Sequence, residues 1–169
     1  MIKTNLHRLF TTSLFLFLLA LTIALHSCQD RAATQDEYDL VVYGGTSAGI
    51  AAAVQAKRMG KSVILVEPSS RIGGLTTGGL GQTDIGNKAA IGGISREFYQ
   101  GIKEYYDIPA NWKWQQKEEY KDGGQTRTAA GESSMWTFEP SAAMAVYENW
   151  IDTYNIPLVF KQQLDRENG

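Results

Sequence analysis

Apolar residues along the chain gather in short continuous runs that alternate with stretches of helical spacing. Residues 39–43 (DLVVY) form one run, which ends at two glycines. Residues 62–67 (SVILVE) form a second run, which ends at an acidic residue followed by proline. Short apolar runs bounded by glycine and proline are typical of buried parallel strands. The pattern therefore predicts a strand at each of these two places.

A helix is predicted between the two runs. Small and apolar residues recur at helical spacing from Ala48 to Met59, and Gly60 is the kind of residue at which helices end. Ser47 is placed to cap the N-terminus of this helix. A strand, a helix and a strand within about 30 residues make a βαβ unit. The sequence thus predicts an α/β fold of the Rossmann type with a parallel sheet.

The rest of the chain is predicted to alternate in the same way. Pro140 suits the first turn of a helix, and Phe98 and Ile102 share one face of another. We expect a glycine-dense loop over residues 72–93, a helix over 95–106 and an irregular excursion over 107–134. An extended piece over 136–139, a helix over 140–154 and a strand over 156–160 should follow.

The first residues have the pattern of an export signal. Lys3 and Arg8 precede an apolar run over residues 14–25, which is shorter than the roughly 20 residues that a membrane-spanning helix needs. Cys28 then follows a small residue, an arrangement that resembles the lipobox of bacterial lipoproteins. We expect residues 1–28 to be a signal peptide with a lipobox. The alternative is an uncleaved anchor helix.

This resemblance implies where the protein resides. Cys28 would be lipidated and become the new N-terminus, and the polar residues 29–37 would form a tether. The protein would be exported and anchored in the cell envelope, on the periplasmic or cell-surface side, with the lipid as its only membrane contact. Because the leader has no twin arginine, any cofactor would bind outside the cytoplasm.

Composition narrows the possible chemistry. The 169 residues suit one domain, and a net charge of −2 without a basic stripe argues against a nucleic acid partner. Cys28 is the only cysteine, and both histidines, His7 and His26, lie in the predicted signal. The mature chain would therefore lack a disulfide, a thiol redox pair, a cysteine-ligated iron–sulfur cluster and a Ser/His or Cys/His nucleophile, and we expect no metal site. We expect its chemistry to come from a cofactor, and the catalytic residues stay unknown.

A glycine-rich turn links the first predicted strand to its helix. In the pattern G-x-G-x-x-G the first glycine makes the tight turn and the last lets the helix pack on the strand, but here the middle position is threonine. The N-terminus of the helix offers amides to a diphosphate. The residues predicted to bind a cofactor here are Gly44, Gly45, Thr46, Ser47, Ala48 and Gly49.

An acidic residue at the end of the second strand accompanies this turn. Glu67 comes 18 residues after Gly49 and is placed to accept hydrogen bonds from ribose hydroxyls. The alternative is a plain βαβ packing unit whose glycines serve only the turn. Together the turn and the acid predict a dinucleotide site without deciding between FAD and NAD.

The next segment favours FAD. Residues 71–81 (RIGGLTTGGLG) follow the acid after a short loop, and this order resembles FAD-dependent oxidoreductases. A glycine doublet brings bare backbone close to the diphosphate and flavin, and an arginine adds a fixed charge near the ADP half. We therefore add Arg71, Gly73, Gly74 and Thr77 to the predicted FAD-binding residues.

Further motifs narrow the resemblance. Together with residues 44–49 and 71–81, residues 91–99 (IGGISREFY) and 136–143 (WTFEPSAA) resemble a group related to the flavoprotein subunit of heterodisulfide reductases, whose bacterial members are sometimes labelled xanthan lyases. This resemblance implies FAD-dependent hydride or electron transfer on a small-molecule or carbohydrate-related substrate. Members of the group are much longer. Residues 38–169 are therefore expected to be the N-terminal, ADP-binding part of an FAD-binding Rossmann domain, incomplete at the C-terminus and inactive alone.

Two other functions remain open from the sequence. One is an NAD(P)-binding dehydrogenase, and the other a non-catalytic envelope lipoprotein with a decayed Rossmann unit. The charged pairs Arg96–Glu97 and Glu118–Glu119 are interpreted as solvated faces rather than acid/base groups. Three tryptophans lie in or just after the irregular excursion: Trp112, Trp114 and Trp136. They either line a substrate cleft or bury the loop, and the sequence does not decide between these two roles.

Overall fold

The computed structural model describes residues 37–82, 85–120, 127 and 131–167. The chain divides into two units, residues 1–36 and 37–169, and the description concerns the second. The predicted signal peptide, the lipidation site Cys28 and the tether up to residue 36 lie outside the described residues. Within the described ranges, no helix is long and apolar enough to cross a membrane.

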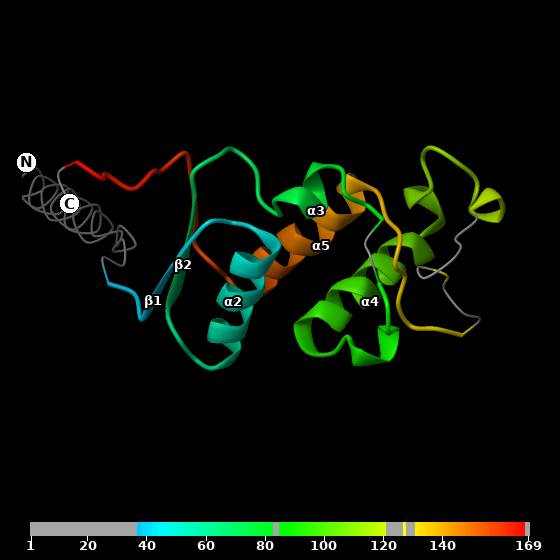
Figure 1. The fold of residues 1–169 in the computed structure, drawn as a ribbon, viewed down its shortest axis with the longest axis horizontal. Helices are drawn as coiled ribbons and strands as arrows, with labels where there is room; N and C mark the ends of the chain where they lie inside the picture. Colours follow the sequence, from blue (N-terminus) through cyan, green and yellow to red (C-terminus); the bar gives the residue numbers. More distant parts are fainter. Residues whose placement is uncertain (1–36, 83–84, 121–126, 128–130, 168–169) are drawn as a thin grey trace, which may run out of the picture. The chain divides into compact units, whose positions relative to one another are not determined.

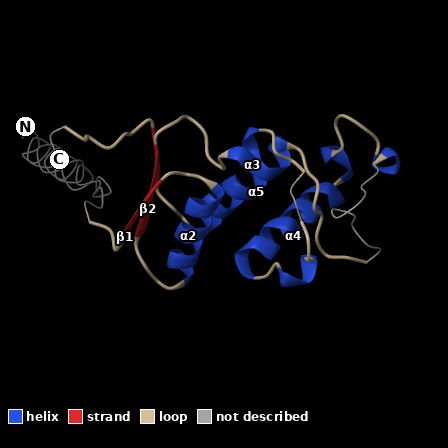
Figure 2. Ribbon diagram, viewed as in Figure 1, coloured by secondary structure: helices blue, strands red, loops and turns tan. Residues whose placement is uncertain are grey.

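Three parallel strands form the sheet, in the spatial order β1-β2-β3. They are β1 (Leu40–Tyr43), β2 (Val63–Glu67) and β3 (Leu158–Phe160). Leu40 lies opposite Val63 and Leu65 opposite Leu158. Figure 2 shows β1 and β2 side by side, with the labelled helices to the right of them. The predicted α/β fold with a Rossmann-type βαβ unit is confirmed.

Helix α2 (Ser47–Arg58) connects β1 to β2, and the long segment from β2 to β3 holds α3 (Leu75–Gly78), α4 (Gly93–Asp107) and α5 (Pro140–Thr153). Three short 3-10 helices, η1 (Lys88–Ala90), η2 (Pro109–Asn111) and η3 (Lys117–Glu119), complete the regular elements of the described chain. The predicted helices over 95–106 and 140–154 correspond to α4 and α5.

Several boundaries differ from the sequence prediction. Residues 72–93 were expected to be loop throughout, but they contain α3 and η1. The last strand begins at Leu158 rather than at residue 156, although the Pro157 carbonyl already accepts a hydrogen bond from the Leu65 N–H. Within the predicted extended piece 136–139, Thr137 forms an antiparallel bridge with Gln82 and Glu139 has an extended backbone.

The expectation that β1 is a buried strand is wrong for the described chain. Val41 is 59% exposed, and Leu40 and Tyr43 are also exposed. The reason is position: β1 is an outer strand of the described sheet, paired along one edge with β2. Strand β2 lies between two neighbours, and Val63 and Leu65 are buried.

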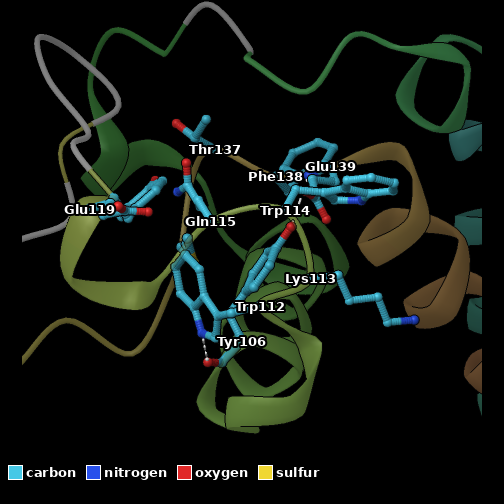
Figure 3. Close-up of a pocket in the computed structure, with 11 residues that line it drawn as sticks. Tyr106, Trp112, Lys113, Trp114, Gln115, Glu119, Thr137, Phe138 and Glu139 are labelled. Carbon is cyan, nitrogen blue, oxygen red and sulfur yellow. Dashed lines mark hydrogen bonds between the residues drawn. The ribbon is translucent and has the colours of Figure 1, made fainter.

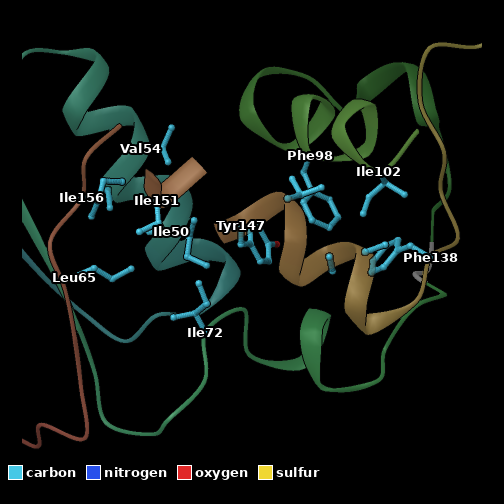
Figure 4. Close-up of a cluster of buried hydrophobic side chains, with 14 of the residues drawn as sticks. Ile50, Val54, Leu65, Ile72, Phe98, Ile102, Phe138, Tyr147, Ile151 and Ile156 are labelled. Atoms are coloured by element: carbon cyan, nitrogen blue, oxygen red, sulfur yellow. The ribbon is translucent and has the colours of Figure 1, made fainter. Parts of the chain in front are cut away.

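The hydrophobic core is built where α2 meets β2 and where α4 meets α5 (Figure 4). Phe98 of α4 stacks on Tyr147 of α5 at 4.9 Å between ring centroids. Gly101 allows close approach, since a Cβ there would lie 3.1 Å from a Val146 methyl carbon. Each buried large apolar side chain stabilises the fold by about 1.5–3 kcal/mol relative to exposure. The core thus fixes both helices that follow the glycine-rich loop.

Charged side chains link three helices at the surface. The Arg58 guanidinium of α2 donates two hydrogen bonds to the Glu97 carboxylate of α4, at 2.9 and 2.6 Å, and one to the Tyr154 hydroxyl at 2.8 Å. Arg96 lies over the buried ring of Trp136, 5.2 Å from its centroid. Glu97 and Arg96 are thus partly exposed, and both also hold neighbouring elements together.

Candidate cofactor site

The turn between β1 and α2 has the geometry that its glycines predict. Gly44 adopts a φ of 105°, in the left-handed region that favours glycine, and its N–H donates to the Val66 carbonyl at 2.7 Å. A Cβ at Gly49 would lie 2.0 Å from the Gly44 carbonyl oxygen. Only glycine at position 49 lets the first turn of α2 lie this close to the end of β1.

Thr46, at the middle position of the fingerprint, caps α2. Its hydroxyl accepts a hydrogen bond from the Gly49 N–H at 3.2 Å, and its carbonyl accepts the bond from Ile50 N–H at 2.9 Å. The prediction that Ser47 is the cap is therefore wrong by one residue, because Thr46 is the last extended residue. The amides of Ser47 and Ala48 precede this first intrahelical bond and so have no partner within the helix.

The loop after β2 docks directly on this turn. The Ser47 hydroxyl donates to the Gly73 carbonyl at 3.1 Å and lies 2.7 Å from the Thr76 hydroxyl. The Gly73 N–H donates to the Gly45 carbonyl at 2.6 Å. The structure therefore brings together the two motifs that the sequence singled out, although 26 residues separate Ser47 from Gly73.

The conformation of the docked loop depends on its own residues. Gly73 has a φ of 91°, and a Cβ there would lie 2.2 Å from a Thr77 methyl carbon. Thr77 is fully buried and its hydroxyl donates to the Ile72 carbonyl, while the Arg71 guanidinium donates to the Thr77 carbonyl. Thr77 and Arg71 thus hold the loop. Their predicted contact with FAD stays a prediction.

Glu67 lies at the junction of β2, the turn and the loop. One carboxylate oxygen accepts from the Gly45 N–H and the other from the Ser69 N–H, both at 2.7 Å, and the residue is 8% exposed. Desolvation raises the pKa of Glu67, but hydrogen bonds from Ser69 and Gly45 outweigh it and hold the pKa below its ordinary value. The sequence missed this bond to the turn.

The lowered pKa predicts how Glu67 affects stability. Its contribution should be fully present above the ordinary pKa of 4.5 and lost as the pH falls through the lower folded value. Denaturant unfolding of the wild type and Glu67→Gln should therefore show a difference in free energy of unfolding that shrinks below about pH 4.5. The exposed Glu148→Gln provides the control. A difference for Glu67→Gln that stays constant down to about pH 3 would contradict this role.

Two hydroxyl groups beside the predicted Ser47, those of Thr76 and Tyr147, were not predicted from the sequence. Ser47, Thr76 and Tyr147 line a cavity of about 320 Å³ next to the start of α2, together with aromatic side chains of α4 and α5. Burial raises the pKa of Tyr147, so its hydroxyl stays protonated. Tyr147 is 100 residues from Ser47 in sequence, and its position in a helical repeat indicated only a core role.

The residues of this junction fit the ADP half of a dinucleotide. A Cβ built on Gly44 meets no atom within 4 Å, so the turn leaves open space beside its backbone. The Ser47 and Ala48 amides can bind a diphosphate at the positive end of α2. Each carboxylate oxygen of Glu67 accepts one hydrogen bond from a backbone N–H. A carboxylate has about four lone-pair positions that can accept hydrogen bonds, so each oxygen can accept one more, from a ribose hydroxyl.

Comparison with known families agrees with this geometry. Residues 39–167 match the family described as FAD dependent oxidoreductase. The match covers most of the chain, and the chain therefore belongs to the family of FAD-dependent oxidoreductases. FAD is the cofactor of this family. No curated protein matches the chain.

Three solved structures with similar folds are distant from this chain in sequence. They include OTEMO in complex with FAD and NADP, with 16% identity and a TM-score of 0.39 over 73% of this chain and 18% of the other. A second is a 3-ketosteroid-delta4-(5alpha)-dehydrogenase from Rhodococcus jostii RHA1, with 18% identity and a TM-score of 0.40 over 77% of this chain and 40% of the other. A third is a flavin monooxygenase from Stenotrophomonas maltophilia, with 16% identity and a TM-score of 0.36 over 72% of this chain and 27% of the other. The chain thus spans less than half the length of each structure.

Proposed function

We propose that this chain supplies the ADP-binding half of the flavin site of an FAD-dependent oxidoreductase. The observation that supports this most directly is the contact between the two motifs. The Ser47 hydroxyl donates a hydrogen bond to the Gly73 carbonyl, and Glu67 accepts one from the Gly45 N–H of the same turn. When bound, FAD would supply hydride or electron transfer through its isoalloxazine ring. The residues described here bind and orient the other end of the cofactor.

Each part of the junction has a separate role in this proposal. The amides of Ser47 and Ala48 hold the diphosphate, helped by the dipole of α2, which contributes up to about 1 kcal/mol at an exposed site. Glu67 accepts hydrogen bonds from the ribose hydroxyls while it keeps Gly45 in place. Gly74, with a φ of 55°, leaves the backbone bare where the loop passes Thr46.

Equilibrium dialysis against FAD and NAD⁺ tests this function against its two rivals. We expect the chain to retain FAD, with weak affinity because one half of the cofactor provides most contacts. Tighter retention of NAD⁺ than of FAD would favour an NAD(P)-binding dehydrogenase. Retention of neither would favour a non-catalytic envelope lipoprotein.

Within the family, a relationship to the flavoprotein subunit of heterodisulfide reductases is part of the proposal. It is supported by the motifs at residues 71–81, 91–99 and 136–143. The iron–sulfur clusters of those relatives are not expected here, because the chain lacks cysteines after position 28. A carbohydrate-related or other small molecule is the proposed substrate class.

Export and lipid anchoring at Cys28 also belong to the proposal, supported by the apolar run and the small residue before the cysteine. Cys28→Ala should move the protein from the membrane fraction to the soluble fraction and abolish incorporation of labelled fatty acid. Cys28 is the only cysteine, so Ser27→Ala serves as a neighbouring control that keeps the thiol. Unchanged fractionation and labelling of Cys28→Ala would rule out the lipid anchor.

A further inference from the structure

A second cavity lies away from the cofactor junction. It has a volume of about 380 Å³ and is lined by Tyr106 near the end of α4, by residues of the segment that follows α4, and by Met135 and residues 137–139 (Figure 3). This volume lies within the usual range for small-ligand sites. Residues of the β1–α2 turn and of the loop 71–77 are not part of its lining.

One wall of the cavity is aromatic and fixed in position. The Trp112 indole N–H donates to the Tyr106 carbonyl at 2.7 Å, and the two ring centroids lie 4.9 Å apart. The Tyr106 hydroxyl accepts from the Glu139 N–H at 3.1 Å, and burial holds the pKa of Tyr106 above its ordinary value. The wall is therefore preorganised and uncharged.

Trp114 adds a large exposed ring at the cavity. It is 83% exposed, in contrast to the fully buried Trp136. The sequence left open whether these tryptophans bury the excursion or line a cleft. In the structure Trp136 is buried in the protein interior, whereas Trp114 offers an indole face to a ligand at the cavity.

The polar lining consists mainly of hydrogen-bond acceptors. Glu119 and Glu139 contribute carboxylates, and Gln115 contributes an amide. The Glu119 carboxylate is held by the Gln116 N–H at 2.9 Å. The Thr137 hydroxyl is buried and has no hydrogen-bond partner among the described residues. Among the described lining residues, two carboxylates stand against one cation, Lys113, so this part of the lining is acidic, which disfavours an anionic ligand.

We propose that this cavity binds a neutral pyranose unit of a carbohydrate. Such a ring has an apolar C–H face that packs on an indole, and hydroxyl groups that donate to carboxylates and both donate to and accept from an amide. A nucleobase would also stack on Trp114, but it presents few donors to surrounding acceptors. The proposal goes beyond the flavin site and does not depend on it.

Saturation-transfer NMR on the full chain in detergent tests this site. The probes are methyl β-glucopyranoside, methyl β-galactopyranoside, glucuronic acid and adenosine, each with and without excess ADP. We expect transfer to at least one neutral glycoside, weaker transfer to glucuronic acid, weaker transfer to adenosine when excess ADP is present, and no effect of ADP on the glycoside signal. ADP is expected to bind at the cofactor junction and not in this cavity. If the flavin proposal fails and ADP does not bind, the glycoside signal should therefore stay the same.

Variants locate the binding. Trp114→Ala should weaken binding of the glycoside about tenfold, as removal of an aromatic anchor typically does, and Gln115→Ala should weaken it less. Leu164→Ala removes another exposed apolar side chain, outside the cavity, and should leave binding unchanged. Equal binding by Trp114→Ala and the parent chain, no transfer to either neutral glycoside, or stronger transfer to glucuronic acid, or to adenosine in the presence of excess ADP, would overturn the proposal.

Discussion

Gly49→Ala is expected to destabilise the protein by about 4 kcal/mol or more, among the largest effects of a single methyl group. The added carbon would lie 2.0 Å from the Gly44 carbonyl oxygen, and this oxygen belongs to the backbone and cannot rotate away. Relief requires that α2 move off β1, which opens the contact between Ser47 and the docked loop. Denaturant unfolding followed by circular dichroism measures the loss.

Gly78→Ala is the matched control for this experiment. Gly78 lies at the end of α3, and a Cβ there meets no atom within 4 Å. Its substitution should change the free energy of unfolding by about 0.5 kcal/mol or less. Similar stabilities for Gly49→Ala and Gly78→Ala would mean that the helix does not pack on the strand as described.

Glu67→Arg is expected to weaken FAD binding by about 10- to 100-fold. A lost hydrogen bond to a charged acceptor typically costs about 1.5–3 kcal/mol, and two N–H donors of the junction lose their acceptor as well. Fluorescence polarisation of FAD with increasing protein measures the affinity. Circular dichroism of the same samples establishes that the variant is folded.

Two further substitutions make this result specific. Glu67→Gln keeps the size of the side chain and one carbonyl acceptor, so its affinity for FAD should fall between those of the parent and Glu67→Arg. Glu139→Gln removes a carboxylate from the other cavity and should leave FAD affinity unchanged. If folded Glu67→Arg binds FAD like the parent, the ribose does not lie at Glu67.

The local pattern of the sequence was sufficient for the elements that frame the cofactor site. Strand β2 and helix α2 follow from short-range rules, namely apolar runs and helical spacing. Gly44 follows from a turn that requires a positive φ, and Gly49 from the close approach of the helix to that turn. Helix α5 follows from Pro140 and an apolar repeat in the same way. These features depend on neighbours in the sequence, which is why they could be predicted.

What the sequence missed depends on contacts between distant residues. Helix α3 is only four residues long and forms in a glycine-rich segment, where Thr77 is buried against Ile72 and Gly73. The bond from Gly45 to Glu67 joins two motifs across the sheet. Trp114 is exposed, whereas Trp136 is buried beside Tyr99 and Arg96 of α4, and this difference depends on contacts between residues far apart in the sequence. Periodicity holds no information on any of these.

The central claim is that the junction of the β1–α2 turn, Glu67 and the docked loop binds the ADP half of FAD. Competition against FAD bound to the chain tests it directly, with ADP and FMN as the two halves of the cofactor and fluorescence polarisation as the readout. We predict that ADP displaces FAD from the parent chain and that FMN at the same concentration does not. Displacement by FMN but not by ADP would contradict the claim, as would the absence of any FAD binding.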